Sequence, residues 1–199
     1  MTASWLKQMG WNDVSVIRLE DVPGGRMSGP HRPRPFGLGR ERVATISPVD
    51  LKRRLDAGTV TLVDLEYSKA YRNGHIPGAW FATRTRLGAA VEKLRPTESI
   101  VLTSPDGDLA HIAAAELART TALPIQALGG GTRAWTMAGF PPLASGDDRM
   151  AETSDDVWLP AREQGGDRES AMRAYLAWEI DLVKQMATDD NHSFKVVKV

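Results

Sequence analysis

A short loop in the middle of the sequence combines residue types that can hold an anion or activate a nucleophile. It follows the apolar run at 100–102 and precedes an Ala-rich segment, which predicts a buried strand, a tight turn and a helix. The start of such a helix offers free backbone N–H groups and the positive end of its dipole to an anion or a thiolate. The loop consists of Ser104, Pro105, Asp106, Gly107, Asp108, Leu109 and Ala110.

The residues in and around this loop restrict its chemistry. The chain contains no cysteine, which excludes disulfides, thiolate metal sites and cysteine nucleophiles in this chain. A nucleophilic Ser104 would need a base within hydrogen-bond reach, and the nearest histidine in sequence, His111, belongs to the following helix. The nucleophile-elbow pattern G-x-S-x-G is also absent. We therefore expect the Ser104 hydroxyl to cap the helix or to hydrogen-bond to backbone groups of the loop.

Other residues with chemical potential fit structural roles better. Asp64 ends a predicted strand without a paired acid, so we expect it to fix the backbone rather than act as a general base. The glycine run Gly129–Gly131 matches neither dinucleotide-binding nor P-loop patterns. His, Asp and Glu do not occur at metal-ligand spacing. The sequence therefore predicts neither a cofactor nor a metal site.

The elements that must position the loop alternate between strand and helix. This alternation predicts an α/β fold with a central, mainly parallel sheet and helices on both faces. In such a sheet the binding crevice lies at the carboxyl ends of the strands, where Ser104 falls. The expected strands are 59–64, 79–82, 99–103 and 125–128; the expected helices are 48–57, 67–73, 83–94, the segment from the loop to about 119, and 132–138.

Composition along the chain divides it into four parts. Residues 1–22 predict a helix followed by a strand over 14–19, a remnant of a preceding repeat of the same unit. A Gly-, Pro- and Arg-rich stretch at 23–42 predicts a linker. The α/β domain is expected at 43–146, and a C-terminal extension with an amphipathic helix, over 168–187, at 147–199.

Three stretches of the domain carry short motifs in a fixed order. The motifs are Asp64-Leu65-Glu66 followed by Gly74-His75-Ile76-Pro77-Gly78-Ala79; the strand, loop and helix at Ser99–Arg119; and Leu128-Gly129-Gly130-Gly131 followed by Ala134-Trp135 and Ala138-Gly139-Phe140-Pro141. Together these motifs resemble the rhodanese family of sulfurtransferases, which implies a three-layer rhodanese-like fold. The flanking segments resemble bacterial proteins with several rhodanese repeats, so the chain resembles the last repeat of such a protein.

The resemblance implies a loop chemistry that this sequence does not supply. In the family, a cysteine at the start of the loop takes a sulfane sulfur from a donor such as thiosulfate, stores it as a persulfide and passes it to cyanide or another thiophile. The matching position is Ser104. The loop also carries Asp106 and Asp108, and Glu66 stands where the family has an arginine. Glu66 and Arg133 are expected at the rim of the pocket.

These departures predict a rhodanese-like domain without sulfurtransferase activity of its own and with a scaffold, regulatory or interaction role. The alternative hypothesis is a component of a thiosulfate or persulfide sulfurtransferase in which a partner or an upstream repeat supplies the catalytic cysteine. A relationship to the cell-cycle dual-specificity phosphatases is a weaker hypothesis, because these enzymes also require the loop cysteine.

Composition limits the partners. The 199 residues carry a formal net charge of zero, which does not favour a polyanionic partner such as nucleic acid. The sequence has neither an apolar run long enough to span a bilayer nor a signal-peptide pattern, so we expect a cytoplasmic protein without a membrane partner. Trp5, Leu6 and Trp11 are expected to expose apolar surface, which suggests a homodimer or a cysteine-bearing sulfurtransferase partner.

Overall fold

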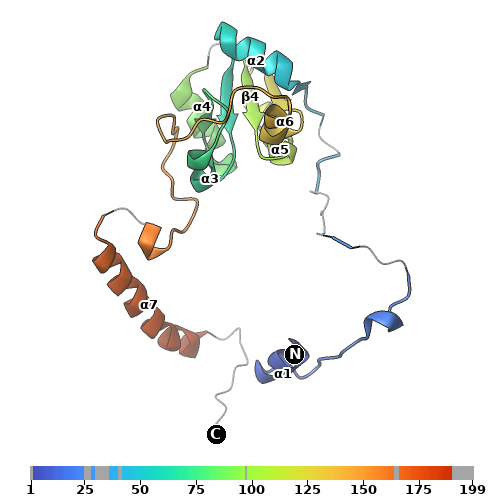
Figure 1. Cartoon of the computed structure of the whole chain (residues 1–199), viewed down its shortest axis with the longest axis vertical. Coiled ribbons are helices and arrows are strands. Elements are labelled where there is room, and N and C mark those ends of the chain that lie inside the picture. The colour runs from blue at the N-terminus through green and yellow to red at the C-terminus, as the bar shows by residue number, and fades with distance from the viewer. Residues whose placement is uncertain are drawn as a thin grey trace. The chain divides into compact units, whose positions relative to one another are not determined.

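The computed structural model of this chain describes residues 2–24, 28–29, 36–39, 42–96, 98–163 and 166–189. It contains two compact units: Arg32–Trp158, which holds the sheet, and a second unit made of Met1–His31 and Leu159–Val199 (Figure 1). Most of the predicted linker at 23–42 and the end of the C-terminal extension lie outside the described residues.

A five-stranded parallel sheet forms the centre of the larger unit, as predicted. The strand order is β1-β5-β4-β2-β3, so β4 and the loop that follows it lie in the middle (Figure 1). The register pairs Asp64 of β2 with Thr103 of β4, which brings the ends of both strands to one edge. The strands are β1 (Thr45–Ile46), β2 (Thr61–Asp64), β3 (Trp80–Phe81), β4 (Ile100–Thr103) and β5 (Ile125–Leu128).

Helices cover both faces of this sheet and confirm the predicted α/β architecture. One core cluster joins the sheet to α4 (Leu87–Leu94) and α5 (Asp108–Leu117). The other joins it to α2 (Pro48–Ala57), α3 (Ser68–Asn73) and α6 (Gly131–Met137). All of β4 is buried because both of its faces are covered, which explains its unbroken apolar run.

Local sequence signals explain where α2 begins and ends. The Ser47 hydroxyl accepts a hydrogen bond from the backbone N–H of Asp50, and Pro48 occupies the first turn. Gly58 closes the helix in the left-handed conformation, at φ 68°. The predicted helix boundaries are confirmed here.

The structure differs from the predicted elements in three places. A strand at Thr45–Ile46 was not expected; it pairs with β5 and is too short to show alternation. The helix expected at 83–94 begins with a 3-10 turn, η2 (Arg84–Arg86), before α4. The predicted strand at 14–19 is wrong: α1 (Thr2–Gln8) is followed by residues without regular structure and by the 3-10 turn η1 (Leu19–Asp21).

The failed strand shows the limit of an alternating pattern. A strand needs a neighbour to accept and donate its backbone hydrogen bonds. No described strand pairs with residues 14–19, and Val16 is 79% exposed. The apolar alternation in this segment therefore does not correspond to burial.

The C-terminal helix is present where the sequence predicts it. It is α7 (Arg168–Thr188), preceded by the 3-10 turn η3 (Ala161–Glu163). The Asp167 carboxylate accepts from the backbone N–H of Glu169 and caps the helix. No residue of α7 is buried. Among the helices that the structure describes, none is long and apolar enough to cross a membrane.

A strap formed by residues 144–156 runs along β3 and belongs to the larger unit. The backbone N–H of Phe81 donates to Arg149, and the N–H of Ala151 donates back to Phe81. Asp155 forms an ion pair with Arg86 at 2.5 Å. The acidic segment is thus docked on the domain rather than forming a free connection.

The start of α6 packs directly on the β4–α5 loop. The backbone N–H groups of Thr132 and Arg133 donate to the carbonyl oxygens of Ser104 and Pro105, at 2.9 and 3.1 Å. Gly131 lies between these groups with φ 62°, and a Cβ atom there would collide with the Ser104 carbonyl oxygen. Only glycine fits this close backbone approach.

Replacement of this glycine tests the packing. We expect Gly131→Ala to lower the free energy of unfolding by about 3 kcal/mol or more, because it combines a backbone collision with an unfavourable φ. Gly88→Ala is the matched control: a Cβ there meets no atom within 4 Å, so the change should be neutral or stabilising by less than about 1 kcal/mol. Urea unfolding followed by circular dichroism measures both. Equal unfolding midpoints for the two variants would contradict the packing argument.

Candidate functional site

Ser104 is the first residue after β4 and is completely buried. Its Oγ accepts a hydrogen bond from the backbone N–H of Ala110, in the first turn of α5, at 3.2 Å. The hydroxyl thus satisfies one of the N–H groups that a helix start leaves without a partner. No histidine in the described part of the chain hydrogen-bonds to this Oγ, so the structure does not assemble a Ser–His pair around Ser104.

The rest of the loop is held by its own backbone. Asp106 is exposed, and its Oδ1 accepts from the backbone N–H of Asp108 at 3.1 Å. Gly107 precedes α5 with φ 90°, a conformation that glycine adopts without strain. Leu109 and Ala110 belong to the first turn of α5. The expected strand, turn and helix are therefore present, with Ser104 at the base of the turn.

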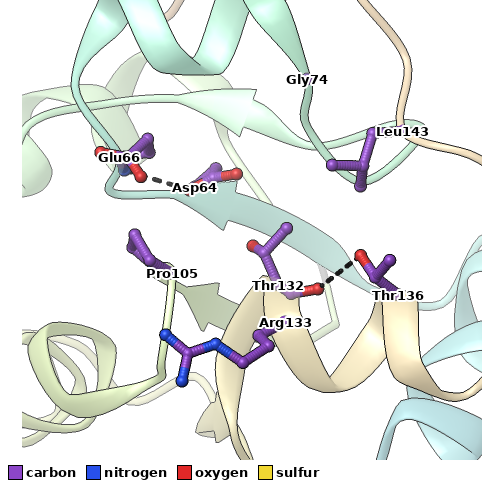
Figure 2. A pocket seen from close by; sticks show the side chains of 8 residues that line it. All are labelled: Asp64, Glu66, Gly74, Pro105, Thr132, Arg133, Thr136 and Leu143. Atoms are coloured by element: carbon purple, nitrogen blue, oxygen red, sulfur yellow. Dashed lines mark hydrogen bonds between the residues drawn. The ribbon is translucent and has the colours of Figure 1, made fainter.

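Two cavities lie beside the loop, and they divide the candidate residues between them. The acid-lined cavity, as we call the first, has a volume of about 310 Å³ (Figure 2). The second, of about 230 Å³, is lined by Asp106, Gly107, Asp108 and His111 among others. Buried Ser104 lines neither of them, and nor does Leu109. The acid-lined cavity is bounded by Asp64, Glu66, Gly74, Pro105, Thr132, Arg133, Thr136 and Leu143.

The acidic candidate residues are thus divided between the two cavities. Figure 2 shows Asp64 and Glu66 on the wall formed by the end of β2, and Arg133 on the wall formed by α6. Glu66 and Arg133 therefore line the same cavity, as the sequence suggested for a pocket rim. The loop carboxylates Asp106 and Asp108 line the other one.

Asp64 combines a contact to the backbone with a position on the wall of the acid-lined cavity. It is only 1% exposed, and its Oδ1 accepts from the backbone N–H of Glu66 at 3.0 Å, the backbone-fixing role that we expected. It also lines the acid-lined cavity. Burial raises the pKa of Asp64 from 3.8 to about 7; the Glu66 hydrogen bond opposes this rise and the Glu66 charge adds to it. Its position at the carboxyl end of a strand was the available sequence signal.

The Gly74-His75 motif has a structural role. His75 is buried and stacks on Tyr71 with ring centroids 3.9 Å apart. Its Nδ1 lies 2.8 Å from the Tyr71 carbonyl oxygen, while the Tyr71 hydroxyl donates to the Ala79 carbonyl at 2.7 Å. These contacts fix the turn between α3 and β3. They position Gly74, which lines the acid-lined cavity.

The described residues do not offer a metal centre. Across these ranges, no group of three or more His, Asp or Glu side chains is arranged to hold a metal ion. The acid-lined cavity instead combines two carboxylates with one guanidinium, which suits polar or charged organic groups.

The raised pKa of Asp64 predicts a pH dependence of stability. Between its unfolded pKa of 3.8 and its folded pKa of about 7, the folded protein keeps a proton that the unfolded chain has lost. The free energy of unfolding therefore falls as pH rises through this range. Asp64→Asn lacks this titration and keeps an acceptor for the Glu66 N–H. The stability of the variant relative to wild type should rise by about 2 kcal/mol between about pH 5 and pH 7, measured by urea unfolding. A difference that does not change with pH would contradict this assignment.

Comparisons with known proteins agree with this geometry. Residues 47–138 match the family model described as Rhodanese-like domain. Among solved structures, the thiosulfate sulfurtransferase from Pseudomonas aeruginosa is similar with a TM-score of 0.80 and 34% identity, over 99% of this chain and 37% of that protein. A Rhodopseudomonas palustris protein, described as of unknown function and a possible tyrosine phosphatase, has a TM-score of 0.50 and 22% identity, over 59% of this chain and 99% of that one, which supports the fold alone.

A curated relative matches part of the chain. An HTH-type transcriptional regulator of Mycobacterium tuberculosis is 31% identical over 115 residues, which is 51% of this chain and 48% of the regulator. The chain thus spans about half the length of this relative. The family match covers β2 to β5 and the loop around Ser104. Residues 47–138 are therefore similar to the rhodanese-like domain, and the fold of this stretch is that of the similar solved structures.

Proposed function

We propose that this domain does not transfer sulfur itself and serves as a scaffold, regulatory or interaction module. The observation that carries this proposal is the state of Ser104, at the position where the resemblance puts the family's nucleophilic cysteine. Its hydroxyl is buried and accepts the N–H of Ala110. The reactive species of the family is a thiolate, and a serine hydroxyl neither ionises near neutral pH nor forms a persulfide. The chain contains no cysteine and therefore no thiol.

The charges around the loop support the same proposal. Asp106 and Asp108 flank the second cavity, and Glu66 lines the acid-lined cavity. An oxyanion donor such as thiosulfate would be repelled by about 1 kcal/mol for each carboxylate 4 Å away in bulk water, and by more near a protein surface. The one described cation that lines either cavity is Arg133. The balance of charge around the loop is therefore unfavourable for binding of the anionic sulfur donor.

A regulatory role is supported by the curated relative. The matched region makes up 48% of a protein described as an HTH-type transcriptional regulator. In a regulator of this kind, the domain would bind a ligand and signal this binding to its partner, and it would not catalyse a reaction.

Thiocyanate release from thiosulfate and cyanide tests the absence of activity. We expect none above background for wild type or for the control Ser104→Ala. Ser104→Cys places a thiol at the start of α5, where the helix dipole and N–H groups lower its pKa. We expect Ser104→Cys to release thiocyanate. A triple variant that also carries Asp106→Asn and Asp108→Asn, and so lacks both loop carboxylates, should release thiocyanate about tenfold faster than Ser104→Cys alone. Measurable turnover by the unmodified chain would overturn the proposal.

A second candidate function is a component of a sulfurtransferase whose catalytic cysteine lies in a partner or an upstream repeat. It is favoured by the similarity over 99% of this chain to a stretch that makes up only 37% of the Pseudomonas aeruginosa thiosulfate sulfurtransferase. Exposed apolar side chains are available for such contacts: Trp5 and Trp11 near the N-terminus, and Leu176, Trp178 and Ile180 on α7. A homodimer is the alternative partner for these residues.

Mixing experiments test this second candidate. The kcat/KM for thiosulfate of a cysteine-bearing sulfurtransferase from the same organism should change by about threefold or more when the full chain is added. Ser104→Ala should have the same effect as wild type, because the buried hydroxyl cannot contact a partner. Light scattering of the chain alone over a range of concentrations detects a homodimer. An unchanged kcat/KM with every such enzyme of the organism would count against the component role.

A further inference from the structure

The long helix α7 (Figure 1) carries an apolar stripe that no described part of the chain covers. The stripe consists of Leu176, Ile180, Val183 and Ala187. Ile180 and Val183 are 76% and 74% exposed, and Leu176 is 51% exposed. Because these residues follow one another at helical spacing, their side chains lie on one side of α7. A contiguous row of exposed apolar side chains is typical of a surface that binds another protein surface.

A different side of α7 is partly buried. Ala171, Tyr175 and Leu182 belong to this side, and the helix contacts η3. From the pitch of an α-helix, these three positions lie about 120° around the helix from the exposed stripe. No residue of α7 is buried, and helices without packing partners are marginally stable in water. The exposed stripe is therefore the surface that a further packing partner would cover.

Two opposite charges border the exposed stripe. Glu179 precedes Ile180 on one side of it, and Lys184 follows Val183 on the other. When two helices of this pattern pair in parallel and in register, Glu179 of each helix lies beside Lys184 of the other. This ion pair forms twice, once on each side of the seam. An antiparallel pair would instead bring Glu179 of one helix close to Glu179 of the other.

Contacts within α7 leave this pairing open. Lys184 forms an ion pair with Asp181 at 2.9 Å, and Glu179 shares a hydrogen bond with Tyr175. An ammonium group has several donors and a carboxylate several acceptor sites, so each can take a second partner. Both Glu179 and Lys184 are exposed, so a second helix can reach them.

We propose that the exposed stripe of α7 binds the same stripe of a second copy of this chain, as a short parallel pair of helices in register. Each layer of the seam then joins identical residues, and the alternation of Leu176 with β-branched Ile180 favours two strands. Glu169 and Arg173, which precede the stripe, form an ion pair within the helix and end the apolar seam. Because the seam is short, we expect a dissociation constant of about 1–100 μM.

A second copy fits this stripe better than a globular surface does. The repeat of apolar residues at alternating spacings of four and three is the pattern of helices that pair lengthwise. The ion pair between Glu179 and Lys184 requires the same two residues on the partner, which a second copy supplies. This assignment names a partner for the interaction role proposed above and rests on that proposed function, although it involves no residue of the β4–α5 loop.

Sedimentation equilibrium of the full chain at about 5–500 μM tests the pairing. We expect a reversible monomer–dimer equilibrium for wild type. Ile180→Lys places a charge in the seam and should weaken the dimer about tenfold or more. Gln185→Lys is the matched control, because it adds the same charge at an exposed position on the opposite side of α7 and should leave the dissociation constant unchanged. A wild-type monomer at every concentration would mean that another occupant covers the stripe and would overturn the proposal, as would equal dissociation constants for wild type and Ile180→Lys.

Cross-linking tests the direction and register of the two helices. The chain contains no cysteine, so Val183→Cys introduces a single thiol into the seam. In a parallel pair in register the two thiols meet, and oxidised glutathione, which takes up their two electrons and two protons, should link them in a disulfide. Gln185→Cys is the control and should stay unlinked under the same conditions. A wild-type dimer whose Val183→Cys variant is linked no faster than Gln185→Cys would overturn the parallel arrangement.

A charge exchange tests the ion pair directly. Glu179→Lys should weaken the dimer about threefold or more, because it places two positive charges side by side on each side of the seam. The double variant Glu179→Lys with Lys184→Glu restores opposite charges and should recover the wild-type dissociation constant. Failure of the second change to recover any affinity would contradict the register. Thiocyanate release by the unmodified dimer would overturn the proposed lack of sulfur transfer and leave the pairing of α7 intact, so the two proposals fail separately.

Discussion

The contact between the backbone of the β4–α5 loop and the start of α6 is the constraint on which the site depends. Two carbonyl oxygens of the loop, from Ser104 and Pro105, accept the N–H groups of Thr132 and Arg133. This contact exists only because Gly131 has no side chain. It holds the α6 wall of the acid-lined cavity, which carries Arg133, against Pro105 of the loop. The contact uses main-chain atoms, so the side chain of Ser104 takes no part in it.

A second constraint comes from strand geometry. Side chains alternate across a strand, and Leu62 of β2 packs in the cluster that includes Trp135 of α6. Asp64, two residues later, faces the same side of the sheet. A carboxyl group is thereby placed under α3 and α6, where desolvation keeps its proton until near neutrality. The chemistry of the acid-lined cavity therefore depends on the alternation of side chains along β2 as much as on the presence of an aspartate at position 64.

The sequence predicted the regular part of this arrangement well. Strong local signals, such as the Ser47-Pro48 helix start and the apolar run of β4, identified the elements and their order. The two-residue strand β1 carried too little pattern, and the alternation at 14–19 had no partner strand to make it a β-strand. Both errors concern pairing between distant segments, which local patterns do not contain.

The site was harder to predict than the fold. Asp106 is close to Pro105 in sequence, yet they line different cavities on the two sides of the loop. Glu66 and Arg133, far apart in sequence, line the same one. Sequence proximity does not show which side of a turn a residue faces. The burial of the Asp64 carboxyl group is likewise a property of the packed structure, because it depends on which elements pack around the end of β2.

The strap at residues 144–156 has a consequence for solubility. β3 is the last strand in the sheet, so one side of it would otherwise present free N–H and C=O groups. The strap occupies that side through the N–H groups of Phe81 and Ala151 and the carbonyl of Arg149. Such an uncovered edge is a template for pairing between molecules. The family match ends at residue 138, so a protein with every family motif and no strap would carry an edge prone to aggregation.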